Sequence, residues 1–219
     1  MSRVKLAVFD CDGTLVDGQA SICEAMEAAF AAEGLAAPAR PAIRRAVGLS
    51  LPQAMRTLLP GETDEVHSAL VERYKDAFRT ARNDGRLSQP LFDGIAEVLR
   101  ALAASGWTLA VATGMSSRGL AHCLAANGVA DLFATLQTAD HHPSKPHPQM
   151  LETALFEADA APEDAMMIGD TAYDMQMARD AGVRAIGVDW GYHHPRELRA
   201  AGAEVVVESP AELLRVLLA

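Results

Sequence analysis

The sequence predicts an α/β protein with a doubly wound parallel sheet and an all-helical domain inserted after the first strand. Three observations lead to this fold class. Residues 4–9 form a short apolar run, as found in strands buried on both faces. Residues 18–84 show only helical periodicity, and from residue 90 onward strands and helices alternate. We therefore assign residues 1–15 and 90–219 to an α/β core and residues 16–89 to the inserted helical domain.

The composition is that of an acidic protein with ample material for a core. Half of the 219 residues are hydrophobic, which argues against disorder. A formal charge of -10 argues against nucleic acid or an anionic membrane as the main partner, because both need a positive surface. The three cysteines are widely spaced and indicate reduced thiols. No apolar stretch resembles a signal peptide or approaches the roughly 20 residues of a membrane span, so we expect a cytoplasmic protein.

Four helices are predicted in the inserted domain. The first contains Ile22, Met26 and Phe30 at four-residue spacing, and we place a capping box at residues 21–24. A short basic helix follows around residues 42–47. A third helix starts at a second capping box, residues 50–53. A fourth, longer helix has an apolar stripe formed by Val66, Leu70, Tyr74 and Phe78.

After residue 90 the periodicity alternates between strand and helix. Five further strands are predicted, at residues 107–112, 133–138, 165–168, 184–188 and 204–207. Helices are predicted before, between and after these strands. One contains Ile95 and ends at Gly106, and another ends at Gly182. The others start at Ser116 or Ser117, at His147 and Pro148, and at Ser209. This alternation favours a Rossmann-like sheet with helices on both faces.

Polar residues follow several of the predicted strands at the point where each strand ends. Asp10 and Asp12 follow the first strand, Thr113 the second and Asp170 the fourth, while Lys145 lies in the loop beyond the third. The carboxyl ends of parallel strands share one edge of the sheet, so these side chains can converge. Each alone is compatible with a turn, a helix cap or a solvated loop. Their joint occurrence at one edge favours a functional site.

This set of side chains suits phosphoryl transfer through a covalent aspartyl phosphate. Residues two apart on a strand share a face, which suits a nucleophile, Asp10, and an acid/base, Asp12. Two carboxylates this close repel each other unless a cation or a shared proton relieves them. Asp170 together with Asp10 offers the hard oxygen ligands that Mg²⁺ prefers. Lys145 and the Thr113 hydroxyl can hold phosphoryl oxygens.

Four segments resemble, in order, the four motifs of the haloacid dehalogenase-like hydrolases. They are Asp10–Asp17, Ala112–Gly114, Ser144–Pro148 and Ile168–Asp174, and the resemblance covers essentially the whole chain. The resemblance implies that the inserted domain is a cap over the site, that Asp10 is the nucleophile and that Asp12 is the acid/base. It implies Mg²⁺ on Asp10, the Asp12 backbone carbonyl and Asp170, with Asp174 nearby as a ligand or support. It implies phosphate binding by Thr113, the Gly114 backbone and Lys145.

Residues 91–94 and 187–192 are most similar to phosphoglycolate phosphatases within that family. The implied partner is a small phosphorylated metabolite, with 2-phosphoglycolate the leading candidate. The sequence does not distinguish a monomer from a homodimer. Arginine can hold a carboxylate in a bidentate fork. One of the cap arginines therefore becomes a candidate for binding the second anionic group of the substrate: Arg40, Arg44, Arg45 or Arg56.

Other functions share parts of this pattern. Dehalogenases are similar in fold but lack the second carboxylate, so Asp12 argues against them. Phosphonate hydrolases of the group use a cap lysine, and Lys75 is the cap lysine here. A sugar-phosphate phosphatase or phosphomutase stays open, since it would share every core motif. A phospho-accepting signalling domain is the remote alternative, because such domains are shorter and have no cap.

The remaining polar clusters have ordinary explanations. His141, His142 and His147, and separately His193 and His194, could suggest zinc, but neither cluster has a third ligand at a familiar spacing. We interpret them as loop histidines at the rim of the site. Cys11 lies between the two aspartates, and its side chain is expected to face the core on the other side of the sheet.

Overall fold

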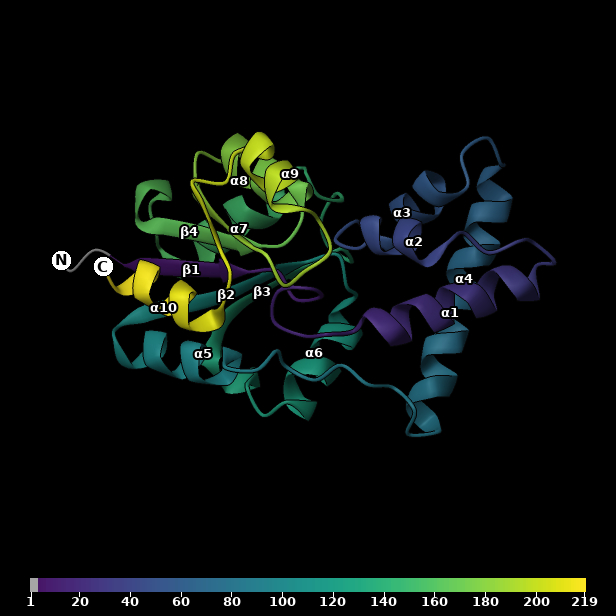
Figure 1. Ribbon diagram of the computed structural model, residues 1–219, viewed down its shortest axis with the longest axis horizontal. Helices are drawn as coiled ribbons and strands as arrows, with labels where there is room; N and C mark the ends of the chain where they lie inside the picture. Colours follow the sequence, from purple (N-terminus) through teal and green to yellow (C-terminus); the bar gives the residue numbers. More distant parts are fainter. Residues whose placement is uncertain (1–3) are drawn as a thin grey trace.

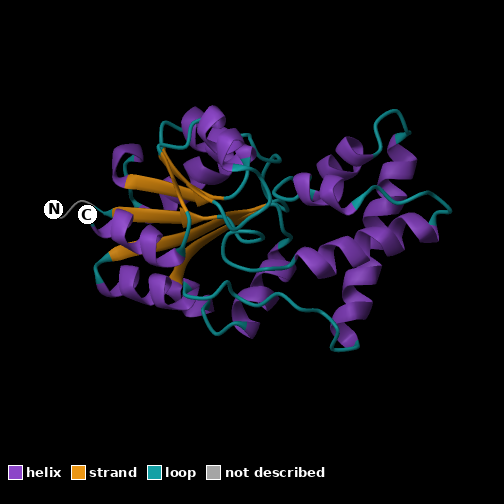
Figure 2. Ribbon diagram, in the orientation of Figure 1, coloured by secondary structure: helices purple, strands orange, loops and turns teal. Residues whose placement is uncertain are grey.

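The computed structural model describes residues 4–219 and contains one six-stranded parallel sheet (Figures 1 and 2). The strand order is β3-β2-β1-β4-β5-β6, which is the doubly wound arrangement predicted from the sequence. The strands are β1 (Lys5–Phe9), β2 (Trp107–Thr113), β3 (Phe133–Thr138), β4 (Ala165–Gly169), β5 (Arg184–Val188) and β6 (Val205–Val207).

The six core helices cover both faces of this sheet. They are α5 (Ile95–Ala104), α6 (Ser117–Ala126), α7 (Gln149–Ala158), α8 (Ala172–Asp180), α9 (Pro195–Ala201) and α10 (Pro210–Leu218), with short 3₁₀ turns at Ala130–Leu132 and Pro162–Asp164. The sequence of β1 is apolar almost throughout because both faces of the strand are buried. Ala7 and Phe9 pack with α5, α6 and α10, whereas Leu6 and Val8 pack with α7 and α8 on the opposite face.

Four helices form the separate cap seen at the right of Figure 1. They are α1 (Gln19–Ala32), α2 (Arg40–Arg45), α3 (Leu51–Leu58) and α4 (Asp64–Asn83). The cap has its own buried core, which includes Ile22, Phe30, Met55 and Leu70. Because the strands point their carboxyl ends toward the cap (Figure 2), the inserted helices lie over the edge where the polar residues were expected. The exact limits of the insertion, residues 16–89, stay a prediction.

The structure corrects several local predictions. α1 begins at Gln19 with Gly18 as its N-cap, so the capping box at residues 21–24 is wrong. The Ser21 hydroxyl instead donates to the carbonyl of Ser88, 3.1 Å away. Ser88 lies in the irregular segment that leads from the cap back to the core. Ser50 does precede α3, but its side chain makes no capping hydrogen bond within the described chain. Helix α9 was not predicted, because it has only seven residues and begins at Pro195.

No helix of residues 4–219 is both long and apolar enough to cross a membrane.

Candidate active site

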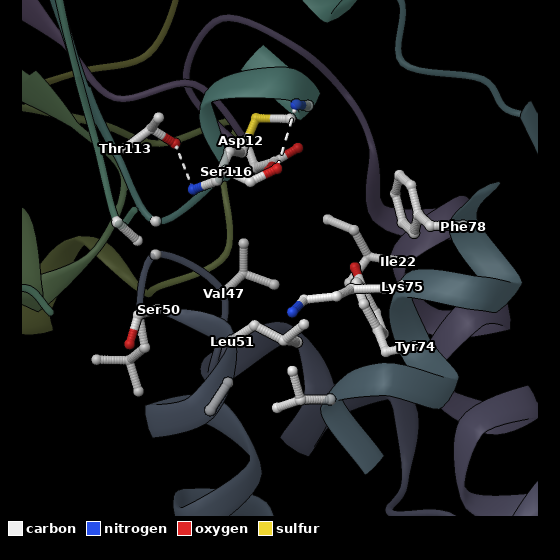
Figure 3. Close-up of a pocket in the computed structure, with 18 of the residues that line it drawn as sticks. Asp12, Ile22, Val47, Ser50, Leu51, Tyr74, Lys75, Phe78, Thr113 and Ser116 are labelled. Atoms are coloured by element: carbon white, nitrogen blue, oxygen red, sulfur yellow. Dashed lines mark hydrogen bonds between the residues drawn. The ribbon is translucent and has the colours of Figure 1, made fainter. Parts of the chain in front are cut away.

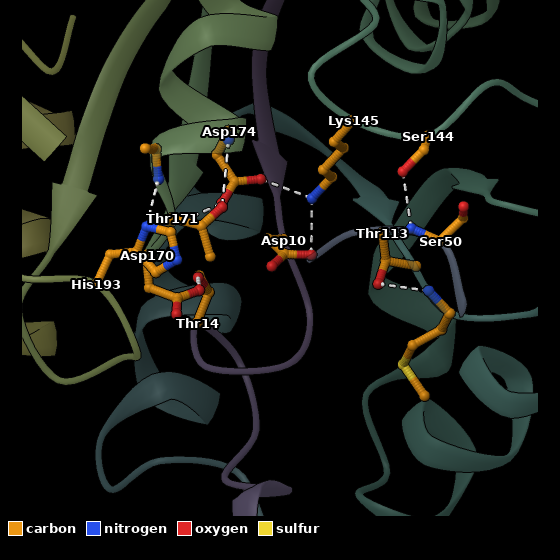
Figure 4. Close-up of polar contacts among 12 residues, drawn as sticks. Asp10, Thr14, Ser50, Thr113, Ser144, Lys145, Asp170, Thr171, Asp174 and His193 are labelled. Atoms are coloured by element: carbon orange, nitrogen blue, oxygen red, sulfur yellow. Dashed lines mark hydrogen bonds and ion pairs between the residues drawn. The ribbon is translucent and has the colours of Figure 1, made fainter. Parts of the chain in front are cut away.

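The polar residues predicted to converge do meet at the carboxyl edge of the sheet (Figure 4). Asp10 directly follows β1, Thr113 ends β2 and Asp170 directly follows β4. Lys145 reaches the same place from the loop between β3 and α7, and Asp174 from the first turn of α8. All five of these side chains are buried.

Lys145 is the centre of the charge arrangement. Its Nζ lies 2.9 Å from Asp10 Oδ1 and 2.6 Å from Asp174 Oδ1. Burial alone would lower the pKa of Lys145, but the two carboxylates outweigh burial and raise the pKa above its ordinary value. Burial raises the pKa of Asp10 to about 6, in spite of the opposing attraction of Lys145. The lysine is therefore charged at physiological pH, and Asp10 loses its proton at a higher pH than an ordinary aspartate does.

Asp170 is held in place from both sides. Its Oδ1 accepts a hydrogen bond from the Thr14 hydroxyl at 2.9 Å, and its Oδ2 accepts one from the Tyr192 backbone N–H at 2.8 Å. A Cβ on Gly13, where φ is +89°, would lie 2.3 Å from Asp170 Oδ2, and a Cβ on Gly191 would lie 2.1 Å from Asp170 Cβ. Both glycines are thus required for the chain to pack this closely against the carboxylate.

Thr14, Gly191 and Tyr192 had no site role in the sequence-based prediction. Thr14 belongs to the Asp-Gly-Thr segment, and Gly191 and Tyr192 to the Trp-Gly-Tyr segment used to narrow the family resemblance. Those motifs were the available signal. They could not show that the loop after β5 reaches back to support a carboxylate that follows β4.

Three carboxylates form a group suited to a metal ion. Oxygens of Asp10, Asp170 and Asp174 all lie within 4.8 Å of one another. Burial, followed by the charges of Asp10 and Asp174, raises the pKa of Asp170 well above its ordinary value. Asp10 Oδ2 is buried and has no hydrogen-bond partner among residues 4–219. Hard oxygen donors with unrelieved negative charge fit a divalent cation such as Mg²⁺.

The predicted Mg²⁺ ligands and this group of three carboxylates agree only in part. Asp10 and Asp170 belong to it, but the Asp12 carboxylate does not; the prediction for Asp12 concerned its backbone carbonyl, and it stays a prediction. Asp174 lies inside the group, yet both of its oxygens already have partners. Oδ1 contacts Lys145, and Oδ2 accepts from the Thr171 hydroxyl at 2.7 Å and the Thr171 N–H at 3.1 Å. This favours a supporting role for Asp174.

The Asp12 side chain is not part of this group of three carboxylates. It lines a cavity between cap and core. Gln89 Nε2 donates to its Oδ1 at 3.4 Å, a long contact. Burial, then the charge of Asp10, raises the pKa of Asp12 to about 7. A carboxyl group that titrates near neutral pH is suited to both donating and accepting a proton.

The cap closes over these groups and leaves a cavity of about 310 Å³ between cap and core (Figure 3). Asp10, Asp12, Thr113 and Gly114 form part of its core side. A Cβ on Gly114 would lie 2.4 Å from the carbonyl oxygen of Leu49, so this glycine permits the cap loop to approach. The Ser50 N–H donates to Ser144 Oγ at 2.8 Å, which fixes the cap next to the loop that carries Lys145.

The four cap arginines proposed for a substrate carboxylate are not at this cavity. Arg40 pairs with Glu27, Arg45 with Glu197 and Arg56 with Asp64, and Arg44 donates to Gln19. Arg44 and Arg45 border a different hollow, of about 280 Å³, which residues of both cap and core line. The basic residues that do line the cavity are Lys75, Arg79, Arg82 and Arg118.

The histidines serve as local hydrogen-bonding groups. Burial lowers the pKa of His193, which accepts from the Ala172 N–H at Nδ1 and contacts the Arg45 carbonyl at Nε2, linking core to cap. His194 caps α9, His147 Nδ1 accepts from the Gln149 N–H, and His142 bonds Gln137. The only side-chain group suited to a metal within residues 4–219 contains no histidine.

Cys11 is buried in the hydrophobic core with Cys123, on the face of the sheet covered by α5 and α6. This is where the strand alternation placed it.

A family model described as haloacid dehalogenase-like hydrolase matches residues 7–188. The chain belongs to this family. Within it, the protein is a phosphatase, a hydrolase of phosphoric monoesters, as its relatives show. A probable phosphatase, IndB, from Dickeya dadantii is 37% identical over 216 residues, which is 95% of this chain and 91% of that protein.

Two further relatives act on different substrates according to their names. A phosphoglycolate phosphatase from Vibrio vulnificus is 30% identical over 99% of this chain and 97% of its own length. An N-acetylmuramic acid 6-phosphate phosphatase from Pseudomonas aeruginosa is 31% identical, over 98% of this chain and 95% of its own length. The crystal structure of a predicted phosphatase from Clostridium acetobutylicum superposes with a TM-score of 0.89, 26% identity and 99% coverage of both chains.

Proposed function

We propose that this phosphatase hydrolyses a small phosphate monoester through a covalent aspartyl phosphate on Asp10, with Mg²⁺ as its cofactor. The observation that carries the proposal is the position of Asp10. Its side chain is buried and lines the cavity between cap and core, with Lys145 on one oxygen and no protein partner, among the described residues, on the other. A carboxylate held in this way is free to attack phosphorus.

Two displacement steps account for the reaction. In the first, an oxygen of Asp10 forms a bond to phosphorus while the bond from phosphorus to the alcohol oxygen breaks, and Asp12 gives its proton to the leaving alcohol. In the second, Asp12 takes a proton from a water molecule whose oxygen attacks phosphorus, and the bond to Asp10 breaks. Inorganic phosphate leaves, and both aspartates return to their starting states.

The cation would be held by Asp10, Asp170 and the Asp12 backbone carbonyl, with Asp174 beside them. When bound, it neutralises part of the phosphate dianion next to these carboxylates. The Lys145 ammonium, the Thr113 hydroxyl and the Gly114 backbone would orient the phosphoryl oxygens. Lys145 also bridges Asp10 and Asp174 and offsets the repulsion between their charges by attracting both.

The names of the relatives favour 2-phosphoglycolate as the first substrate to test. A sugar phosphate is the alternative, which the N-acetylmuramic acid 6-phosphate phosphatase keeps open. A phosphomutase would need the phosphate to return to a second hydroxyl of the same molecule, and a phosphonate hydrolase would need Lys75 free. Lys75 contacts Glu72 at 2.7 Å.

The test of the proposal is phosphate release with and without metal. Purified protein treated with EDTA should be inactive toward p-nitrophenyl phosphate, 2-phosphoglycolate and glucose 6-phosphate, and Mg²⁺ should restore turnover. Full activity in metal-free protein would refute the mechanism. Isomerisation of a sugar phosphate without phosphate release would make the protein a mutase.

A further inference from the structure

The cap side of the cavity is a continuous apolar wall. Four cap segments contribute to it, and Figure 3 shows their side chains around the space in front of Asp12: Ile22 of α1, Val47 of the α2–α3 loop, Leu51 of α3, and Tyr74 and Phe78 of α4. The rings of Tyr74 and Phe78 lie one helical turn apart and stack with their centroids 5.2 Å from each other. Stacking of this kind holds the two rings as one surface.

Two charged groups on this side have partners on their own helix, α4, whereas the buried Nε of Arg82 has no hydrogen-bond partner within residues 4–219. Lys75 pairs with Glu72, and Arg79 with Asp76 at 2.7 Å. The Ser50 N–H is used by Ser144. A sugar hydroxyl moved from water to the apolar wall would lose hydrogen bonds without replacement, and each such loss is unfavourable. The wall therefore disfavours a polyhydroxylated alcohol.

The cavity also has more room than the smallest alcohols fill. Its volume of about 310 Å³ falls within the roughly 300–1,000 Å³ typical of small-molecule sites. Glycolate adds two carbons and a carboxylate to the phosphate, so it would leave the apolar wall in contact with water. An apolar group on the substrate would cover that wall and gain its hydrophobic free energy.

We infer that the alcohol part of the substrate carries an apolar group of about ring size, which packs on Val47, Leu51 and Phe78 while the phosphate lies at Asp10. The inference rests on the proposed phosphatase function and narrows it. It ranks 2-phosphoglycolate and simple sugar phosphates below phosphate esters that carry an apolar side chain.

The test compares 2-phospholactate with 2-phospho-3-phenyllactate. Both are secondary phosphate esters next to a carboxylate, and they differ by one aromatic ring. We expect kcat/KM to be roughly 10- to 100-fold higher for the phenyl compound, because burial of a ring of this size has that effect on binding. Equal or lower kcat/KM for the phenyl compound would overturn the inference.

Variants of the wall locate the effect. Leu51→Gln and Phe78→Gln should each reduce the ratio of the two kcat/KM values by about tenfold. Phe156→Gln is the matched control, because Phe156 is 86% exposed on α7, outside the cavity, and it should leave the ratio unchanged. An unchanged ratio in both wall variants would contradict the proposed packing.

A second measurement does not depend on whether the variants fold. Phenyllactate should inhibit hydrolysis of p-nitrophenyl phosphate by the parent protein at roughly tenfold lower concentration than lactate; equal inhibition would count against the wall as a binding surface. If the parent protein hydrolyses none of the phosphate esters in the presence of Mg²⁺, the proposed function itself is wrong. If it hydrolyses them without preferring the phenyl compound, only the inference fails.

Discussion

The ammonium of Lys145 lies 2.9 Å from Oδ1 of Asp10, and both side chains are fully buried. The same ammonium contacts Asp174 at 2.6 Å. One buried cation thus compensates part of the negative charge of a group that includes three carboxylates. Without it, the site would hold like charges in an apolar setting, where each unpaired charge is strongly unfavourable.

Replacement of Lys145 should therefore destabilise the protein in a pH-dependent way. We expect Lys145→Met to lower the free energy of unfolding by about 3–5 kcal/mol at pH 8. The loss should be smaller at pH 5, because Asp10 and Asp170, whose pKa values are raised, then bind protons and repulsion within the group weakens. Urea unfolding at the two pH values, in EDTA, measures this. Lys75→Met is the control: its exposed pair with Glu72 should contribute less than about 1 kcal/mol. Equal losses at both pH values would show that Lys145 does not act through these charges.

The two aspartates of the first motif should fail in different ways. Asp10→Asn should abolish turnover, because an amide cannot form the phosphoenzyme. Asp12→Asn should lower steady-state turnover by roughly 10²- to 10⁴-fold, yet it should still accumulate phosphoenzyme from p-nitrophenyl phosphate, whose leaving group needs no proton. Mass spectrometry of the acid-quenched protein, with a search for an added phosphoryl group on Asp10, is the measurement. Full steady-state activity of Asp12→Asn would rule out the acid/base assignment.

The pH dependence should separate the two carboxylates. Asp10 must be ionised to attack, and its pKa is raised to about 6 in the metal-free protein. Asp12 must be protonated to donate, and its pKa is raised to about 7. With an alkyl phosphate, kcat/KM should therefore rise with pH as Asp10 loses its proton and fall above about pH 7 as Asp12 loses its own. A bound cation favours the ionised form of Asp10 and should move the rising limb to lower pH.

The choice of substrate provides the control for that profile. The falling limb should be absent with p-nitrophenyl phosphate, because its first step needs no acid. Identical falling limbs for the alkyl and nitrophenyl esters would mean that Asp12 is not the proton donor in this step.

Much of the architecture was predictable because strands and their ends have simple signatures. Three site residues, Asp10, Thr113 and Asp170, could be placed because each lies at the carboxyl end of a predicted strand. Parallel strands present these ends at one edge of the sheet. The side-chain alternation of β1 also placed Cys11 on the correct face.

Contacts set by tertiary packing were beyond the reach of local patterns. Ser21 matches a capping box in sequence, but a long-range hydrogen bond to the Ser88 carbonyl uses its hydroxyl. Arg45 was a reasonable candidate for substrate binding until docking of the cap paired it with Glu197, 2.6 Å away. The support of Asp170 by Tyr192 likewise depends on how a loop folds back, and no periodicity encodes that.

Removal of the Asp170 charge should stabilise the metal-free protein. The folded-state pKa of Asp170 is raised well above its ordinary value, so this residue lowers stability increasingly as pH rises above the pKa of the unfolded chain. In EDTA at pH 8, Asp170→Asn should raise Tm by roughly 2–8 °C, the equivalent of about 1–2 kcal/mol. The gain should shrink at pH 4. Added Mg²⁺ should stabilise the parent protein and hardly affect the variant; equal stabilisation of both would remove Asp170 from the metal site.

Arg82 is the arginine best placed to bind a second anionic group of the substrate. It lines the cavity from the last turn of α4, and its buried Nε has no hydrogen-bond partner within residues 4–219. Loss of a charged contact of this kind costs about 2–3 kcal/mol, so Arg82→Ala should lower kcat/KM for 2-phospholactate by roughly 30- to 150-fold. Hydrolysis of p-nitrophenyl phosphate, which has no carboxylate, should change little. Arg56→Ala is the matched control, because Arg56 pairs with Asp64 on the cap surface, and it should leave both substrates unaffected. A similar loss for both substrates in Arg82→Ala would indicate a structural role for Arg82 rather than recognition of the carboxylate.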